Sequence, residues 1–157
     1  MLKLIAAVEV IGGLLGFGFL YSYVWARYGF SLNPFNLLSL SFFSLCLVAG
    51  IELWRRARRG FPLSVAAQLP QVLMWSTLNT GFKLQAGIQV LVIAQPTGAR
   101  LWFGLGAESL FGPDAVDRQL VALNLAPLTC LAVLLVKGAR FRAAPESELG
   151  SPPQRAA

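Results

Sequence analysis

The sequence predicts an integral membrane protein that is mainly α-helical, with about four transmembrane helices and one β-hairpin. First, 56% of the residues are hydrophobic and 13% are charged, against about 25% charged in soluble domains. Second, a cluster of arginines directly follows an apolar run. Third, side chains near residues 82–109 alternate with a period of two, as in a strand. We expect one polytopic membrane domain over residues 1–142, and a disordered cytoplasmic tail over residues 143–157, which are rich in Pro, Ser, Glu and Gln.

The arginine cluster orients the chain. It consists of Arg55, Arg56, Arg58 and Arg59, directly after Trp54. Arginine stays charged and is costly at a bilayer centre, so the cluster is expected among headgroups and water. Lys and Arg concentrate on the cytoplasmic side of membranes. We therefore expect these four side chains to anchor the topology, in a bacterial-type inner membrane with both termini in the cytoplasm.

Residues 4–25 and 35–54 are the first two predicted spans. Each is long enough for a hydrocarbon core of roughly 30 Å. The first follows Lys3 and lacks the small-residue cleavage motif of a signal peptide, so we interpret it as a retained helix. Pro34 is acceptable at the start of the second helix.

Glu9 is the one acidic side chain well inside a predicted span. An intramembrane carboxyl group is a functional-site hypothesis by default, because its charge is costly to bury and its protonation would make it a proton carrier. Alternatively, Glu9 reaches the headgroups or pairs with Lys3 or the arginine cluster. On the same helix, Gly12 and Gly16 have the spacing that lets two helices approach closely.

Residues 62–80 allow two interpretations. The segment is apolar overall, but Gln68, Pro70 and Gln71 interrupt it. It could form a third span kinked at Pro70, with its amides facing other helices. It could instead lie in the cytoplasmic interface, anchored by Trp75.

Residues 119–136 form the last predicted span, and Lys137, Arg140 and Arg142 follow it. If residues 62–80 cross the membrane, these basic residues face the same side as the arginine cluster. If that segment does not cross, they face the opposite side, against the usual charge asymmetry. Charge placement therefore favours four spans over three.

The alternating stretch has two halves around Gln95-Pro96-Thr97-Gly98, where proline and glycine favour a turn. The apolar members are Phe82, Leu84, Ala86, Ile88, Val90 and Val92 before the turn, and Leu101, Phe103, Leu105 and Ala107 after it. An isolated hairpin is marginal in water, so we expect this one to pack on the membrane, the helices or a partner, on the periplasmic side. A re-entrant apolar loop is the alternative.

The residue inventory argues against several classes of function. Histidine, the commonest general base and metal ligand, is absent. Cys46 and Cys130 lie in apolar segments without the spacing of a metal or redox motif. The basic residues flank apolar runs, which suits anionic headgroups better than nucleic acid. We therefore expect no enzyme, no cofactor or metal, and no nucleic-acid partner.

The fragment Ala6-Ala7-Val8-Glu9-Val10-Ile11-Gly12 resembles the first-helix motif of small multidrug resistance transporters. In that family a membrane-embedded glutamate exchanges protons for cationic drugs, so the resemblance implies this role for Glu9. Pro96-Thr97-Gly98-Ala99, followed by Trp102 and Gly104, is similar to a helical segment of that family. The resemblance is confined to these two fragments. In this sequence the two fragments lie much farther apart than in the family. The second fragment is predicted to form a turn between strands, whereas in the family it is helical.

Two functions follow as expectations. The first is a small non-catalytic accessory or assembly subunit that binds other membrane protein subunits, or further copies of itself, within the lipid bilayer. The unpaired edges of the hairpin and the surface at Gly12 and Gly16 would carry this binding. The alternative is a small proton-coupled transporter with Glu9 as the membrane-embedded carboxylate.

Overall fold

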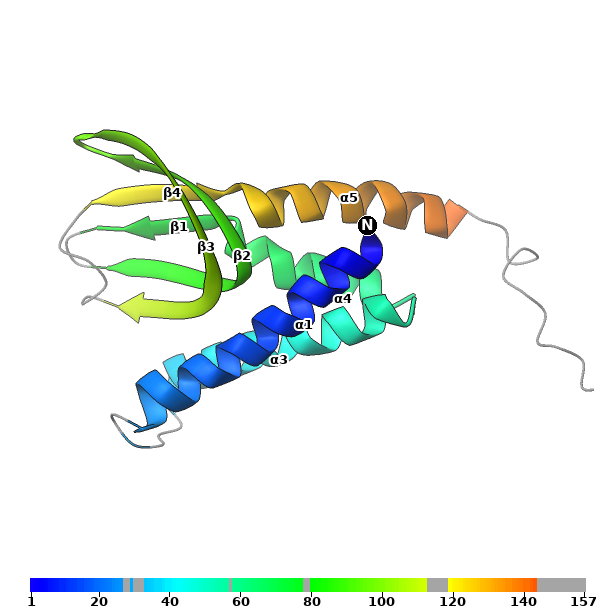
Figure 1. The fold of residues 1–157 in the computed structure, drawn as a ribbon, viewed down its shortest axis with the longest axis horizontal. Helices are drawn as coiled ribbons and strands as arrows, with labels where there is room; N and C mark the ends of the chain where they lie inside the picture. Colours follow the sequence, from blue (N-terminus) through cyan, green and yellow to red (C-terminus); the bar gives the residue numbers. More distant parts are fainter. Residues whose placement is uncertain (27–28, 30–32, 57, 78–79, 113–118, 144–157) are drawn as a thin grey trace, which may run out of the picture.

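The computed structural model describes residues 1–157 apart from residues 27–28, 30–32, 57, 78–79, 113–118 and 144–157 (Figure 1). The chain passes four times along the molecule, between an end where α3 turns into α4 and an end that carries an antiparallel sheet. The elements are α1 (Leu2–Phe19), the π-helix η1 (Leu20–Trp25), α3 (Pro34–Trp54), α4 (Gly60–Gln68), the 3-10 helix η2 (Leu69–Gln71), β1 (Leu73–Ser76), β2 (Gly81–Gln95), β3 (Gly98–Gly112), β4 (Leu120–Asn124) and α5 (Leu125–Ala143). The predicted tail lies outside the described residues, apart from Ala143.

The first two predicted spans are helices that pack against each other. The Asn33 side chain caps the start of α3 by accepting a hydrogen bond from the Asn36 amide at 2.8 Å, and Pro34 takes the first helical position. The helices approach closely at glycine: a Cβ atom at Gly50 would lie 2.7 Å from the Ala6 carbonyl oxygen. This contact leaves no room for a larger residue at Gly50.

Among the described residues, two helices are long and apolar enough to cross a membrane, namely Leu2–Ser22 and Pro34–Trp54. The criterion is one of length and composition, which buried helices of soluble proteins and signal sequences also meet. The apolar part of α5, Leu125–Ala139, is shorter.

The prediction of one helical span over residues 62–80 is wrong, and so is an interfacial helix of that length. Of the residues described in this segment, only those of α4 and η2 are helical, and the chain then extends into β1. Pro70 has no amide hydrogen to continue an α-helix. Beyond it, β1 obtains its hydrogen bonds from β4, pairing Leu73 with Leu123 and Ser76 with Leu120.

The predicted span over residues 119–136 also needs correction at its start. Residues Leu120–Asn124 form β4, and helix α5 begins at Leu125. Asn124 makes the change possible because its Oδ1 accepts hydrogen bonds from the amides of Val90, at 3.0 Å, and Ala126, at 3.3 Å. One side chain thus joins the strand to β2 and caps the helix.

The predicted hairpin is confirmed, and it closes part of the sheet on itself. β2 and β3 pair from Gly81↔Gly112 to Gln95↔Gly98, with the turn at Pro96-Thr97. β2 also pairs with β1 at its start and with β4 near its end, while β1 and β4 pair with each other. The hairpin therefore curves strongly (Figure 1), and Gly87 lies along the curve with φ of 92°.

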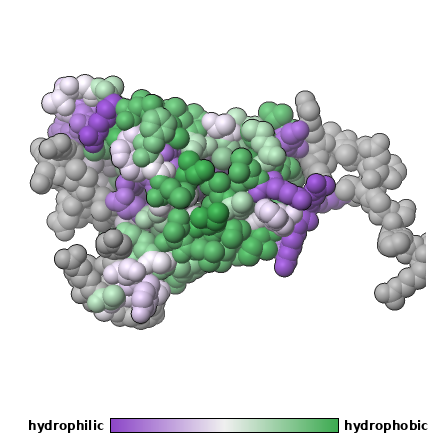
Figure 2. Space-filling view, viewed as in Figure 1, coloured by the Kyte–Doolittle hydropathy of each residue, from purple (hydrophilic) through white to green (hydrophobic). Residues whose placement is uncertain are grey.

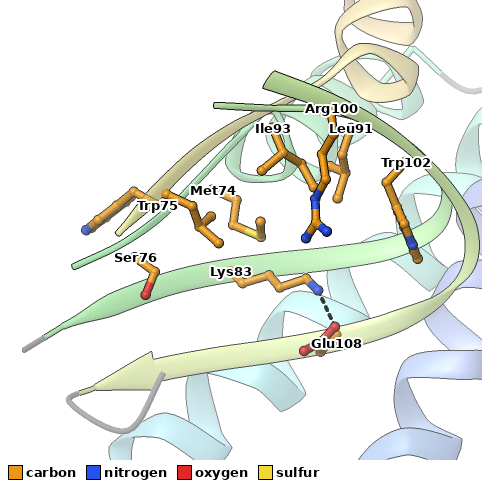
Figure 3. Close-up of a pocket in the computed structure, with 10 residues that line it drawn as sticks. Met74, Trp75, Ser76, Lys83, Leu91, Ile93, Arg100, Trp102 and Glu108 are labelled. Atoms are coloured by element: carbon orange, nitrogen blue, oxygen red, sulfur yellow. Dashed lines mark hydrogen bonds and ion pairs between the residues drawn. The ribbon is translucent and has the colours of Figure 1, made fainter. Parts of the chain in front are cut away.

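Alternation along the hairpin separates two faces. On the convex face, Leu84 and Ala86 join a core that contains Leu20, Phe43 and Cys46 from the helices. Farther along β3, the same face carries the exposed side chains of Leu101, Phe103 and Leu105. The concave face carries Lys83, Leu91, Ile93, Arg100, Trp102 and Glu108 (Figure 3).

Candidate functional site

Glu9 lies on α1, is 2% exposed, and is fully hydrogen-bonded to α4. Its Oε2 accepts a hydrogen bond from Ser64 Oγ at 2.8 Å, and its Oε1 accepts one from Gln68 Nε2 at 3.0 Å. Ser64 and Gln68 are four residues apart, so they share one face of the helix. The carboxyl group is thus held inside the molecule instead of reaching Lys3 or the arginine cluster.

Gln68 connects Glu9 to an apolar cavity of about 280 Å³. The cavity lies between α1, β2 and α5, and Val8, Ile88 and Cys130 contribute to its lining. Gln68 is therefore the route by which the Glu9 hydrogen-bond network meets an open space.

Gln71 holds β2 next to the curve of the hairpin. Its Oε1 accepts a hydrogen bond from the Ala86 amide at 2.8 Å, and its Nε2 donates one to the Ala67 carbonyl at 2.9 Å. Both amides that interrupt residues 62–80, Gln68 and Gln71, thus join separate elements. Sequence alone did not show their partners, which lie on α1 and β2.

Gly12 and Gly16 both face inward. A Cβ atom at Gly12 would lie 2.7 Å from the Ala86 carbonyl carbon, and one at Gly16 would lie 2.1 Å from Phe43 Cδ1. Gly12 therefore lets α1 approach the backbone of β2, and Gly16 accommodates an aromatic ring of α3. The surface that a protein partner could use must lie elsewhere.

The predicted topology anchors gather at one end of the molecule. Arg56 lines a shallow hollow together with Lys3 and Lys137, and Figure 2 shows a hydrophilic group of side chains at that end. Arg59 donates two hydrogen bonds to Glu52, at 2.7 and 2.8 Å. These bonds, and then the charge of the carboxylate, raise the pKa of the Arg59 guanidinium.

Arg55 and Arg58 complete the cluster, and their side chains are exposed. Arg55 caps the end of α3. Basic residues from α1, the α3–α4 turn and α5 thus lie at the same end of the molecule. This agrees with the path of the chain, because after every second pass it returns to the end where it began.

The concave face of the hairpin, together with β1 and β4, encloses a cup of about 220 Å³ (Figure 3). Its charged residues are Lys83, Arg100 and Glu108. Lys83 Nζ donates a hydrogen bond to Glu108 Oε2. Within the part of the chain that the structure describes, Arg100 makes no ion pair, so the cup carries one positive charge in excess.

The edge of β3 is the second notable surface. Of the described strands, only β2 pairs with β3, along all of its length. Leu101, Phe103 and Leu105 project from it with exposed fractions of 54%, 65% and 68%. Sequence reasoning placed these residues on one face of a hairpin with unpaired edges, and in the structure β3 is the hairpin strand that lies at the edge of the sheet.

The second fragment of the transporter resemblance, Pro96-Thr97-Gly98-Ala99, lies in the turn and first residues of β3, whereas the family has a helix there. Among the described residues, no group of three or more His, Cys, Asp or Glu could hold a metal ion. The expected lack of enzyme activity, cofactor and nucleic-acid partner stays a prediction. Comparison of the chain with protein-family models, curated proteins and solved structures finds no match.

Proposed function

We propose that this chain is a small, non-catalytic, multi-pass inner-membrane protein that assembles with another protein chain along the free edge of β3. The observation that carries the proposal is a 15-residue strand with one edge that no other described strand pairs with and a row of exposed apolar side chains. Such an edge presents backbone N–H and C=O groups that a further strand can bind.

The apolar surface of the helices supports a membrane location. Large apolar side chains are exposed on all three long helices: Leu4, Ile11, Leu14 and Leu15 on α1, Leu37, Leu38 and Val48 on α3, and Leu128, Leu135 and Val136 on α5. In Figure 2 a hydrophobic band separates a hydrophilic group near the hairpin tip from the basic end. This distribution suits a bilayer with the basic end in the cytoplasm.

The composition of β3 supports assembly along its edge. Natural sheets protect free edges with charges, prolines or bulges. Between Arg100 and Glu108 the sequence is Leu-Trp-Phe-Gly-Leu-Gly-Ala, which has no charge and no proline. The partner that fits is an extended segment with apolar residues at every second position.

A photo-crosslinking amino acid at position 103, in cells under native expression, tests the proposal. We expect an adduct with a protein, because Phe103 would lie beside the bound segment. The matched control is position 14, since Leu14 on α1 is similarly exposed, at 56%, and is expected to contact lipid. Equal protein adducts at both positions, or none at position 103, would contradict the proposal.

Proton-coupled transport is the second candidate, and the buried Glu9 favours it. Its hydrogen bond to Gln68 connects the carboxyl group to the cavity between α1, β2 and α5. Proteoliposomes carrying the wild type should then release protons when a cationic compound is added, and Glu9→Gln should abolish the release. An accessory protein would show no release in either case.

A further inference from the structure

We infer that the segment bound along β3 is β3 of a second copy of this chain, paired antiparallel about a two-fold axis at Gly104. The inference rests on the proposed function, because it names the partner of the same edge. Its support is the self-complementary order of side chains along β3.

Pairing about Gly104 places residues equally far from position 104 opposite each other. Arg100 then faces Glu108 of the second copy, and Glu108 faces Arg100 of the second copy, because a two-fold axis makes each contact twice. Arg100, Gly104 and Glu108 all lie on the concave face, so the opposite charges meet on the same side of the extended sheet.

Within one copy, Arg100 and Glu108 can still form an ion pair with a second copy. Arg100 lacks an ion-pair partner among the described residues of its own chain. Glu108 binds Lys83 through Oε2 only, and its side chain remains 41% exposed. In the pair, Glu108 would lie between its own Lys83 and Arg100 of the second copy, so that each charged side chain of the cup would face an opposite charge.

The uncharged residues are complementary in the same register. Phe103 faces Leu105 of the second copy on the convex face, so that two exposed apolar side chains would cover each other. On the concave face, Trp102 faces Gly106, where the structure has open space beside the backbone. Within one copy, the Trp102 ring lies over Gly104, where a Cβ atom would come within 2.0 Å of it.

Other registers lose these matches. A two-fold axis at Trp102 would place Arg100 opposite Gly104, and an axis at Gly106 would place Glu108 opposite Gly104. An axis at an odd-numbered residue cannot pair Arg100 with Glu108, because their numbers are symmetric only about 104. The inference therefore specifies one register.

Charge exchange between copies tests the ion pairs. Arg100→Glu alone and Glu108→Lys alone each place like charges opposite each other twice, so each variant should lose the dimer in native mass measurements of detergent-extracted protein. Co-expression of the two variants should restore a mixed dimer, because one copy's introduced charge then faces the opposite charge introduced in the other. A dimer that survives either single change unaltered would overturn the inference.

Cysteine pairs test the register without touching the cup. With Cys46 and Cys130 replaced by alanine, differently tagged copies carrying Phe103→Cys and Leu105→Cys should form a mixed disulfide on mild oxidation. Copies carrying Leu101→Cys and Leu105→Cys, which are out of register, should not. If position 103 photo-crosslinks only to a different protein and no mixed disulfide forms, the inference fails while the proposed function stands. If neither crosslink forms, both fail.

Discussion

At the scale of single residues, the Glu9 carboxyl group is charged or polar and yet buried, with 2% of its surface exposed. A polar group without a hydrogen-bond partner in the interior costs about 1–3 kcal/mol. Here each carboxyl oxygen has a donor, Ser64 on one side and Gln68 on the other. The three side chains therefore stabilise the contact between α1 and α4, whatever their role in function.

The first prediction compares two substitutions at Glu9. Glu9→Gln keeps an oxygen for Gln68 and places an amide against Ser64, whose hydroxyl can accept as well as donate, so we expect nearly unchanged stability. Glu9→Leu leaves both Ser64 and Gln68 without their partner, and we expect a loss of about 1–3 kcal/mol. Unfolding in detergent by a graded denaturant measures the difference. Equal stability of the two variants would show that these hydrogen bonds contribute little.

At the scale of elements, the hairpin depends on the close approach of α1 to β2. Gly87 has φ of 92°, a conformation that L side chains rarely adopt, and a Cβ atom there would lie 2.9 Å from Val8 Cγ1. Gly106 pairs with Gly87 across the ladder, yet a Cβ atom there meets nothing within 4 Å. Of these two paired glycines, Gly87 therefore cannot be replaced without strain, whereas Gly106 has space for a side chain.

The second prediction uses this pair as variant and matched control. Gly87→Ala should destabilise the protein by about 1–3 kcal/mol, because the backbone would be strained and Val8 would have to move. Gly106→Ala should be neutral or stabilising by roughly 0.5 kcal/mol, since alanine restricts the unfolded chain. Thermal unfolding of both purified variants checks this. A similar loss at Gly106 would mean that any side chain on the hairpin, not strain at Gly87, disturbs the fold.

The helices and strands also differ in how well the sequence predicts them. The hairpin was predictable because its alternation persists over many residues on both sides of a Pro-Thr turn. β1 has four residues, too few for a period to emerge. In β4, Val121 and Leu123 are exposed while Ala122 and Asn124 are buried, but four of its five residues are apolar, so by composition the strand resembles the helix that follows.

The candidate site was predictable only in part for a related reason. Glu9 could be selected because one acidic residue in an apolar run is conspicuous. Its partners, Ser64 and Gln68, lie 55 and 59 residues away, and no local pattern links them to α1. β1, β4 and β2 each pair with the other two. These pairings join segments that are distant in the sequence, so no pattern within a single segment predicts them.

At the scale of the whole molecule, the four passes of the chain separate a basic end from the hairpin tip. α1 and α3 make two passes as helices. The next two combine structure types: α4 and η2 lead into β1, and β4 leads into α5. The even number of passes agrees with basic residues at Lys3, in the arginine cluster and at Lys137, because all then face one side.

The third prediction tests this separation with single cysteines, after Cys46 and Cys130 are replaced by alanine. Thr97→Cys, at the hairpin tip, should react with a membrane-impermeant thiol reagent added to intact cells, because the tip should face the periplasmic side. Lys137→Cys, at the basic end, should react only after the membrane is permeabilised. Both positions are exposed, so burial would not explain a missing reaction. Labelling of both positions without permeabilisation would show that no membrane separates the two ends, and the exposed apolar helices would then require a protein cover instead of lipid.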